Sequence, residues 1–142
     1  MRDFQRSKVY AWEQKYVAPM QSATLSIEKA ELFVKGVWLS LGLAGPPIVE
    51  LMPKQATQYF ATGCRSRVRL RPVTPTWIVI HELAHALADD RHGANYMGIY
   101  IKLLDKVLGI PLPLSMFTLK ETKIEYNLAA QPFFVNPGLK IL

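Results

Sequence analysis

The sequence has little of several features that would place it in a more specialised class. It contains one cysteine, Cys64, so an internal disulfide is excluded and nothing indicates an oxidising compartment. Its most apolar span, residues 36–49, is too short to cross a bilayer and contains Pro46 and Pro47. The charged N-terminal residues have no apolar run behind them, so they do not resemble a signal peptide. We therefore expect a cytoplasmic protein without a membrane partner.

The chain also lacks internal repeats and low-complexity linkers. Its 142 residues are typical of one domain, and 50% hydrophobic with 20% charged residues suits a folded chain. We expect a single domain over residues 1–127. Residues 128–142 then form an extended apolar arm, in which Phe133, Phe134 and Val135 lie between prolines. The arm could pack on its own domain or bind a protein partner.

Positive charge is in excess, with a net charge of +6, and part of it follows a regular pattern. Arginines occupy every second position of one short run: Arg65, Arg67, Arg69 and Arg71. Period two predicts a strand whose arginines share one face, while Val68 and Leu70 face a core. Such a row could bind nucleic-acid phosphates or an acidic peptide, or it could keep an edge strand soluble.

Hydrophobic periodicity and breaker residues predict an α+β fold. The expected helices are residues 2–16, 26–42, 76–89 and 95–108, and a short one beginning at Ser115. The expected strands are residues 48–52, 57–61 and 67–71, with a further possible strand at 123–126. These elements suggest a small, mostly antiparallel sheet packed on the helix at 76–89 and on its neighbouring helices.

All three histidines of the chain fall within twelve residues, and two of them form an H-E-x-x-H motif. On a helix, His81 and His85 differ by about 40° around the axis and about 6 Å along it, so both rings point into the same space. That separation suits two ligands of one Zn²⁺ ion. Glu82 points about 100° away from His81 and can act as a general base toward a water molecule. The motif therefore predicts a zinc site with a catalytic carboxylate.

The third ligand depends on where this helix ends. On an unbroken helix His92 would lie about 16 Å beyond His81 and could not share its metal ion. The polar segment A-D-D-R-H-G predicts a helix end near Asp89 or Asp90 and a turn that returns His92 to the site. We take His92 as the third ligand. The rivals are Asp89, Asp90 and Glu125, and Asp89 or Asp90 would otherwise orient a histidine.

These residues resemble a known group of proteins. H-E-L-A-H-A-L followed by His92-Gly93 is similar to the SprT-like minimal zincins, and more closely to a family of small HExxH metallohydrolases of actinobacteria and their phages. Members of that family open with a pattern that also occurs here, as Arg2, Asp3, Gln5, Arg6, Val9, Tyr10 and Glu13. Two features depart from the family: Ala94-Asn95-Tyr96 replaces its Pro-Glu-Phe, and the segment after Asn127 has no counterpart.

The resemblance implies a minimal zincin-like fold and a zinc-dependent metallopeptidase that acts on a peptide or protein. His81, His85 and His92 would hold one Zn²⁺ ion, and Glu82 would move the proton. Tyr96, Tyr100, Tyr126 or the arginine strand could stabilise the oxyanion. By the same resemblance, residues 67–71 would form the edge strand that aligns a substrate, with Arg67, Arg69 and Arg71 as contacts.

Two other functions remain open from the sequence. In one, zinc only stabilises an interaction module without turnover, for example a virion component that docks through the apolar arm. In the other, the arginine strand binds nucleic acid and no catalysis occurs. If the protein is phage-encoded, its location would be the host cytoplasm or the virion.

Overall fold

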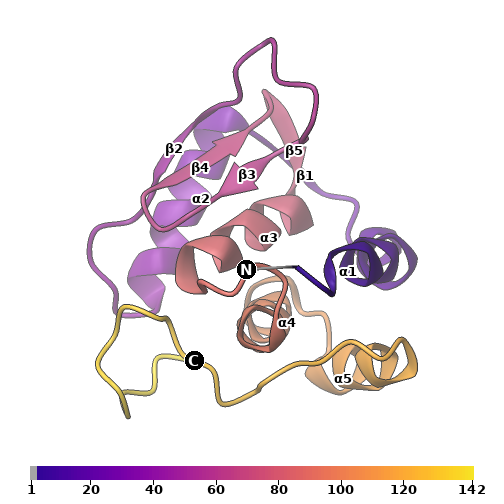
Figure 1. The fold of residues 1–142 in the computed structure, drawn as a ribbon. Coiled ribbons are helices and arrows are strands. Elements are labelled where there is room, and N and C mark those ends of the chain that lie inside the picture. The colour runs from indigo at the N-terminus through magenta and orange to yellow at the C-terminus, as the bar shows by residue number, and fades with distance from the viewer. Residues whose placement is uncertain (1–2) are drawn as a thin grey trace.

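A computed structural model describes residues 3–142 and shows an α+β protein with five α-helices and two small sheets (Figure 1). The helices are α1 (Arg6–Trp12), α2 (Ile27–Ser40), α3 (Thr76–Leu87), α4 (Ala94–Leu108) and α5 (Leu112–Glu121). The strands are β1 (Thr24–Ser26), β2 (Ile48–Leu51), β3 (Thr62–Gly63), β4 (Arg67–Leu70) and β5 (Val73–Pro75). Arg2, which belongs to the predicted N-terminal helix, lies outside the described residues.

Helix α3 lies at the centre of the molecule, between the strands on one side and α4 on the other (Figure 1). Ten of its twelve residues are buried, including His81 and Glu82. A helix that is apolar on nearly all sides must be enclosed, because each exposed face would leave hydrophobic surface in water. Its central position gives the motif residues a rigid support.

The N-terminal helix changes its winding where it approaches α3. Helix α1 continues directly into η1 (Glu13–Val17), a π-helical segment, and then into the 3₁₀ turn η2 (Ala18–Met20). Val9, Trp12 and Val17 are buried, and the helical spacing of Val9 and Trp12 predicted this for those two residues. The Trp12 indole donates a hydrogen bond to the Thr118 hydroxyl of α5 at 2.9 Å. π-Helical turns occur frequently at functional sites.

The three-stranded sheet differs from the mostly antiparallel sheet that the sequence suggested. Its order is β2-β4-β3, with β2 parallel to β4 and β3 antiparallel to β4. The predicted strand at 57–61 is wrong: these residues belong to a long loop, and this loop carries the chain back so that β2 and β4 run in the same direction. Strand β4 is therefore the central strand and not the expected edge strand.

Three other elements differ from the prediction. Strands β1 and β5 form a separate antiparallel pair that was not foreseen. Residues 123–126 form no strand, because the Glu125 backbone N–H donates to the Gln5 side chain and Lys123 has a left-handed φ of 57°. Helix α5 begins at Leu112 rather than Ser115, because Pro113 is tolerated in the first turn of a helix.

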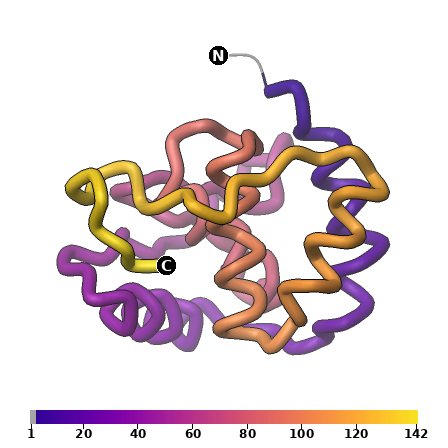
Figure 2. Tube along the Cα trace, turned by 90° about the horizontal axis from the view of Figure 1, so that it is seen from below, coloured from indigo at the N-terminus to yellow at the C-terminus, as the bar shows by residue number. Residues whose placement is uncertain are grey.

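The apolar segment 128–142 lies against its own domain (Figure 2). The Phe134 ring stacks on Trp38 of α2 with 5.6 Å between ring centroids, and the Phe133 backbone N–H donates to the carbonyl of Leu87 at 3.0 Å. The segment thus covers α2 and the end of α3. Within residues 3–142, no helix has the length and apolar character needed to span a membrane.

One glycine allows the chain after α5 to pack closely on α4. A side chain at Gly98 would meet the backbone of Asn127, whose N–H donates to the Ala94 carbonyl at 2.8 Å. We expect Gly98→Ala to lower the free energy of unfolding by about 1–3 kcal/mol, because the backbone must move. Gly36→Ala on α2 has open space and should raise it by up to about 1 kcal/mol. Urea unfolding of both variants measures the difference, and equal effects would contradict this packing.

Candidate metal centre

The three histidines predicted to share a metal ion lie together. The Nε2 atom of His92 is 3.2 Å from Nε2 of His85 and 3.3 Å from Nε2 of His81. All three ligand atoms lie within 4.8 Å of one another. Tetrahedral zinc with Zn–N bonds of 2.0–2.1 Å places its ligand nitrogens about 3.3 Å apart. Two of the three nitrogen separations therefore match tetrahedral zinc, and all three nitrogens are close enough to share one metal ion.

His92 reaches this position because α3 ends at Leu87 and the chain reverses. Arg91 adopts a left-handed conformation with φ of 56°, and the Gly93 N–H donates to the Asp90 carbonyl at 2.9 Å. The reversal puts His92 opposite the ligand face of α3. An uninterrupted helix would have carried His92 away from His81 and His85.

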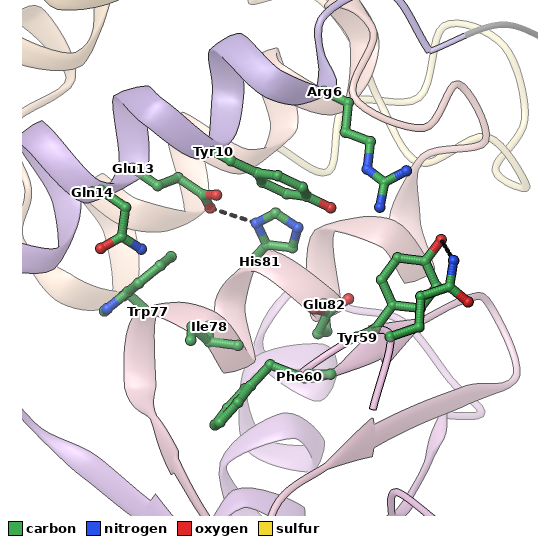
Figure 3. A pocket seen from close by; sticks show the side chains of 12 residues that line it. Arg6, Tyr10, Glu13, Gln14, Tyr59, Phe60, Trp77, Ile78, His81 and Glu82 are labelled. Atoms are coloured by element: carbon green, nitrogen blue, oxygen red, sulfur yellow. Dashed lines mark hydrogen bonds and ion pairs between the residues drawn. The ribbon is translucent and has the colours of Figure 1, made fainter. Parts of the chain in front are cut away.

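Two carboxylates from the N-terminal segment hold the outer nitrogens of the histidines. Glu13 Oε2 lies 2.5 Å from Nδ1 of His81 (Figure 3), and Asp3 Oδ2 lies 2.6 Å from Nδ1 of His92. The Tyr100 hydroxyl donates to the same oxygen of Glu13 at 2.7 Å. Carboxylates in this position fix the tautomer and the ring orientation of metal-binding histidines. The Gln5 amide adds a bond to the His92 carbonyl at 2.8 Å.

Because carboxylates contact Nδ1 of His81 and of His92, the space between the Nε2 atoms of these rings favours a positive charge. When Nδ1–H donates to a carboxylate, the neutral imidazole carries a lone pair on Nε2. If both rings are neutral, His81 and His92 direct two lone pairs at each other across 3.3 Å. A metal ion at the convergence point, or a proton on Nε2 of His81, satisfies both nitrogens. The described residues therefore fit a metal ion by their donor chemistry as well as by their spacing.

Burial and neighbouring charges shift the pKa values of this cluster. Burial holds the pKa of His85 well below its usual range, and the positive charges of His81 and His92, when these rings are protonated, lower it further. Burial also lowers the pKa of His92, although Asp3 opposes the shift. Burial acts on His81 in the same direction, but the Glu13 carboxylate raises the pKa of His81 overall. Neutral His85 and His92 keep their lone pairs, as metal ligands must.

Glu82 lies beside the histidines and is only 6% exposed. Burial raises its pKa to about 7, helped by the nearby Glu13 charge and opposed by His81. A carboxyl group with a pKa near neutrality can both accept and return a proton at neutral pH. This is the protonation behaviour required of the predicted general base.

The tyrosines named as oxyanion candidates have other partners in the structure. The Tyr96 ring stacks on His85 with 4.3 Å between centroids, and its hydroxyl donates to the His81 carbonyl at 2.9 Å. Tyr100 is engaged by Glu13. Tyr126 lines a separate cavity with Lys120 and Lys123. Tyr96 and Tyr100 thus support the histidine rings from the side of α4.

The acidic residues considered as alternative ligands lie outside the histidine cluster. The Asp90 carboxylate accepts the backbone N–H groups of Asn95 and Tyr96, both at 2.9 Å, and so caps the start of α4. Asp89 is exposed. Glu125 is exposed and lines the separate cavity near α5. The carboxylates that contact the histidines are those of Asp3 and Glu13.

The arginines of the predicted basic strand have internal partners. Arg67 and Arg69 both contact Glu50 Oε1, at 3.0 and 2.8 Å. Arg71 donates to three carbonyls of the loop before β3: those of Ala56, Tyr59 and Phe60. The Arg65 guanidinium lies 4.7 Å from the ring centroids of both Trp38 and Phe134. These side chains brace the sheet, the loop and the C-terminal segment.

Two adjoining cavities open onto the centre, with volumes of about 250 and 390 Å³. They share six lining residues: Arg6, Tyr10, Tyr59, Ala61, His81 and Glu82. In Figure 3 Tyr10 lies over His81 while Arg6 and Tyr59 face each other across the opening. We call the two cavities together the cleft. It gives molecules in solution a route to His81 and Glu82.

Sequence reasoning did not assign roles to the N-terminal residues that complete the centre. Asp3, Arg6, Tyr10 and Glu13 all line the cleft or contact a histidine. Their spacing of three, four and three residues is that of one helix face. The signal was therefore present in the opening pattern of the sequence, as a polar stripe on a helix whose other face is apolar.

Comparisons with known proteins do not add to this description. No protein-family model, curated protein or solved structure matches the chain. The site must accordingly be judged from its own geometry, and that geometry shows three histidines that could hold a metal ion.

Glu13 provides a test of the centre that leaves all three ligands in place. Glu13→Gln should weaken Zn²⁺ affinity about 10- to 100-fold, because an amide holds Nδ1 of His81 less strongly than a carboxylate. Competition with a chromophoric chelator measures the affinity. Glu31→Gln, on the exposed face of α2, is the matched control. Equal affinities of the two variants would contradict the assigned role of Glu13.

Proposed function

We propose that this protein is a zinc-dependent metallohydrolase, and specifically a metallopeptidase that cleaves amide bonds with Glu82 as general base. The observation that carries the proposal is the convergence of three imidazole nitrogens beside a buried carboxyl group in an accessible cleft. The H-E-x-x-H spacing on α3 and the resemblance to small zincins support the same reading.

Zinc is a metal that fits this donor set. Imidazole nitrogens suit zinc, copper, iron and nickel, and separations of 3.2 and 3.3 Å agree with tetrahedral coordination by zinc. When bound, such an ion supplies Lewis-acid chemistry, which activates water and polarises an amide carbonyl. His81, His85 and His92 would hold it, with Glu13 and Asp3 orienting two of the rings.

Glu82 has the position and the pKa needed to move a proton. Its carboxyl group follows His81 on α3 and borders both cavities of the cleft. Acting as a base, it would accept a proton from the attacking water molecule, and acting as an acid it would deliver that proton to the leaving amine. Without a metal ion, burial holds the pKa of this carboxyl at about 7, and a bound cation would lower that pKa toward the carboxylate form that a general base needs.

Tyr10 is the tyrosine best placed to assist at the substrate carbonyl. Unlike Tyr96 and Tyr100, it lines the cleft and is 38% exposed. Its ring centroid lies 6.1 Å from that of His81 and 5.2 Å from that of His92. A hydroxyl group in this position could donate a hydrogen bond to a developing oxyanion.

An alternative is a zinc-stabilised module without turnover. The observation that favours it is that the centre joins three separate elements: the N-terminal segment, α3 and the start of α4. A metal ion bound there would add stability to the folded state by mass action. The two functions differ in whether Glu82 is needed for anything beyond packing.

Glu82→Gln distinguishes them. In the enzyme, this variant should bind one zinc ion per chain like the wild type and lose at least about 100-fold in hydrolysis, because the amide cannot take up the proton. Metal content and cleavage of a quenched fluorescent peptide library are the two measurements. Glu121→Gln, on the exposed face of α5, should keep both properties.

Two outcomes would contradict the proposal. Wild-type protein that contains zinc but cleaves no member of the library, and that unfolds on chelation, would favour the structural module. Zinc content that is unchanged after removal of both His81 and His85 would show that the metal ion binds elsewhere.

A further inference from the structure

We infer that the cleft selects peptides that carry a carboxylate beside an apolar side chain, with Arg91 and Arg6 binding the carboxylate. This inference rests on the proposed function, since it names the substrate class of the same site. It differs from the expectation that the arginine strand recognises acidic ligands, because Arg67, Arg69 and Arg71 have internal partners.

The two cavities of the cleft differ in the chemistry of their walls. Beyond the shared residues, the smaller cavity is lined by the apolar side chains of Phe60, Trp77 and Ile78, which Figure 3 shows, and by the polar side chains of Glu13, Gln14 and Gln58. The larger cavity extends toward the turn after α3 and is lined there by Asp3, Thr62, Gly63 and Arg91. His81 and Glu82 border both. A substrate that spans the metal-binding histidines would therefore place one neighbour against aromatic side chains and the other beside a cation.

Within the described part of the chain, the two guanidinium groups of the larger cavity form no ion pairs, although the carboxyl groups of Asp3 and Glu82 line the same cavity. Among residues 3–142, no carboxylate makes an ion pair with Arg6 or Arg91. Asp3 is engaged by His92. The exposed Arg6 guanidinium lies over the rings of Tyr10 and Tyr59, at 5.6 and 5.2 Å from their centroids, and its partners are neutral side chains. Two guanidinium groups without a carboxylate partner therefore border this cavity, and guanidinium groups bind carboxylates with well-defined geometry.

The backbone at Arg91 gives an independent reason to assign its side chain a role. Its φ of 56° is a left-handed conformation that glycine and asparagine adopt more easily than arginine. The turn that returns His92 therefore does not favour arginine at this position. Unfavourable backbone conformations in non-glycine residues cluster at functional sites. The exposed Arg91 side chain borders the cleft rather than packing in the core.

The dimensions favour a single carboxylate over a nucleic-acid strand. The larger cavity has a volume of about 390 Å³ and two arginines, whereas binding along a phosphate backbone uses a row of cations on an open groove. The carboxylate can belong to an acidic side chain or to the C-terminus of a peptide. These two sources share one chemistry and can be separated by experiment.

The test measures peptide binding to zinc-loaded Glu82→Gln protein by fluorescence anisotropy, so that it needs no turnover. The probes are labelled pentapeptides with an amidated C-terminus that contain Phe-Asp, Asp-Phe, Phe-Asn or Asn-Phe. A fifth probe ends in Phe-Gly with a free carboxylate. We expect one Asp peptide or the free-carboxylate peptide to bind about tenfold more tightly than its neutral counterpart, and added salt to reduce this preference.

The variants Arg91→Gln and Arg91→Gly, each with unchanged zinc content, should abolish the preference. Arg91→Gly should also unfold at the same or a higher temperature than its parent, because glycine relieves the left-handed backbone. This excludes misfolding as the cause of the loss. Arg67→Gln, outside the cleft, is the matched control and should keep the preference.

Equal binding of acidic and neutral peptides, no binding of any probe, or a preference that survives Arg91→Gln would each overturn the inference. A wild-type protein that hydrolyses peptides without regard to charge would refute it while leaving the proposed function intact. Conversely, a carboxylate preference in a wild-type protein that never hydrolyses a peptide would refute the proposed function and leave the binding site.

Discussion

The contact between the Glu13 carboxylate and Nδ1 of His81 is the interaction on which the rest of this site depends. It joins residues 68 positions apart in the chain and lies in a region where Glu13 is only 2% exposed. A carboxylate removed from water in this way is unfavourable unless it is paired and hydrogen-bonded. Glu13 meets both conditions through His81 and the Tyr100 hydroxyl. The same contact turns the Nε2 atom of His81 toward the other two histidines.

The N-terminal segment is therefore part of the centre as well as part of the core. Trp12 anchors it to α5, and the π-helical turn that begins at Glu13 continues the helix past α3. Asp3 repeats the function of Glu13 at the other end of the segment, where it holds His92 across a separation of 89 residues. A fold in which α1 moved away from α3 would lose both carboxylates together, and with them the orientation of two rings.

The arrangement of charge follows from which arginines have partners. The positive net charge and the alternating arginines suggested an exposed basic face. The structure instead uses Arg67 and Arg69 to hold Glu50 across β2 and β4, and Arg71 to hold the loop before β3. Arg6 and Arg91, which form no ion pair with a carboxylate of the described residues, border the cleft. The alternating sequence pattern thus predicted the strand correctly, but it did not predict the partners of the arginine side chains.

The sequence by itself determined the local features of this protein. The helices around His81 and after Gly93 follow from periodicity, and the end of α3 follows from its polar turn, because these properties depend on neighbouring residues. The alignment of His81 and His85 is a consequence of helix geometry alone. The resulting histidine cluster was foreseen from these rules.

Only the tertiary structure decided the long-range features. The pairing of β2 with β4, the absence of a strand at 123–126 and the folding of the C-terminal segment onto Trp38 all depend on contacts between distant residues. The choice of Asp3 and Glu13 over Asp89 and Asp90 as histidine partners has the same origin. The physical reason is that a carboxylate finds its partner by the packing of whole elements, which local periodicity does not encode.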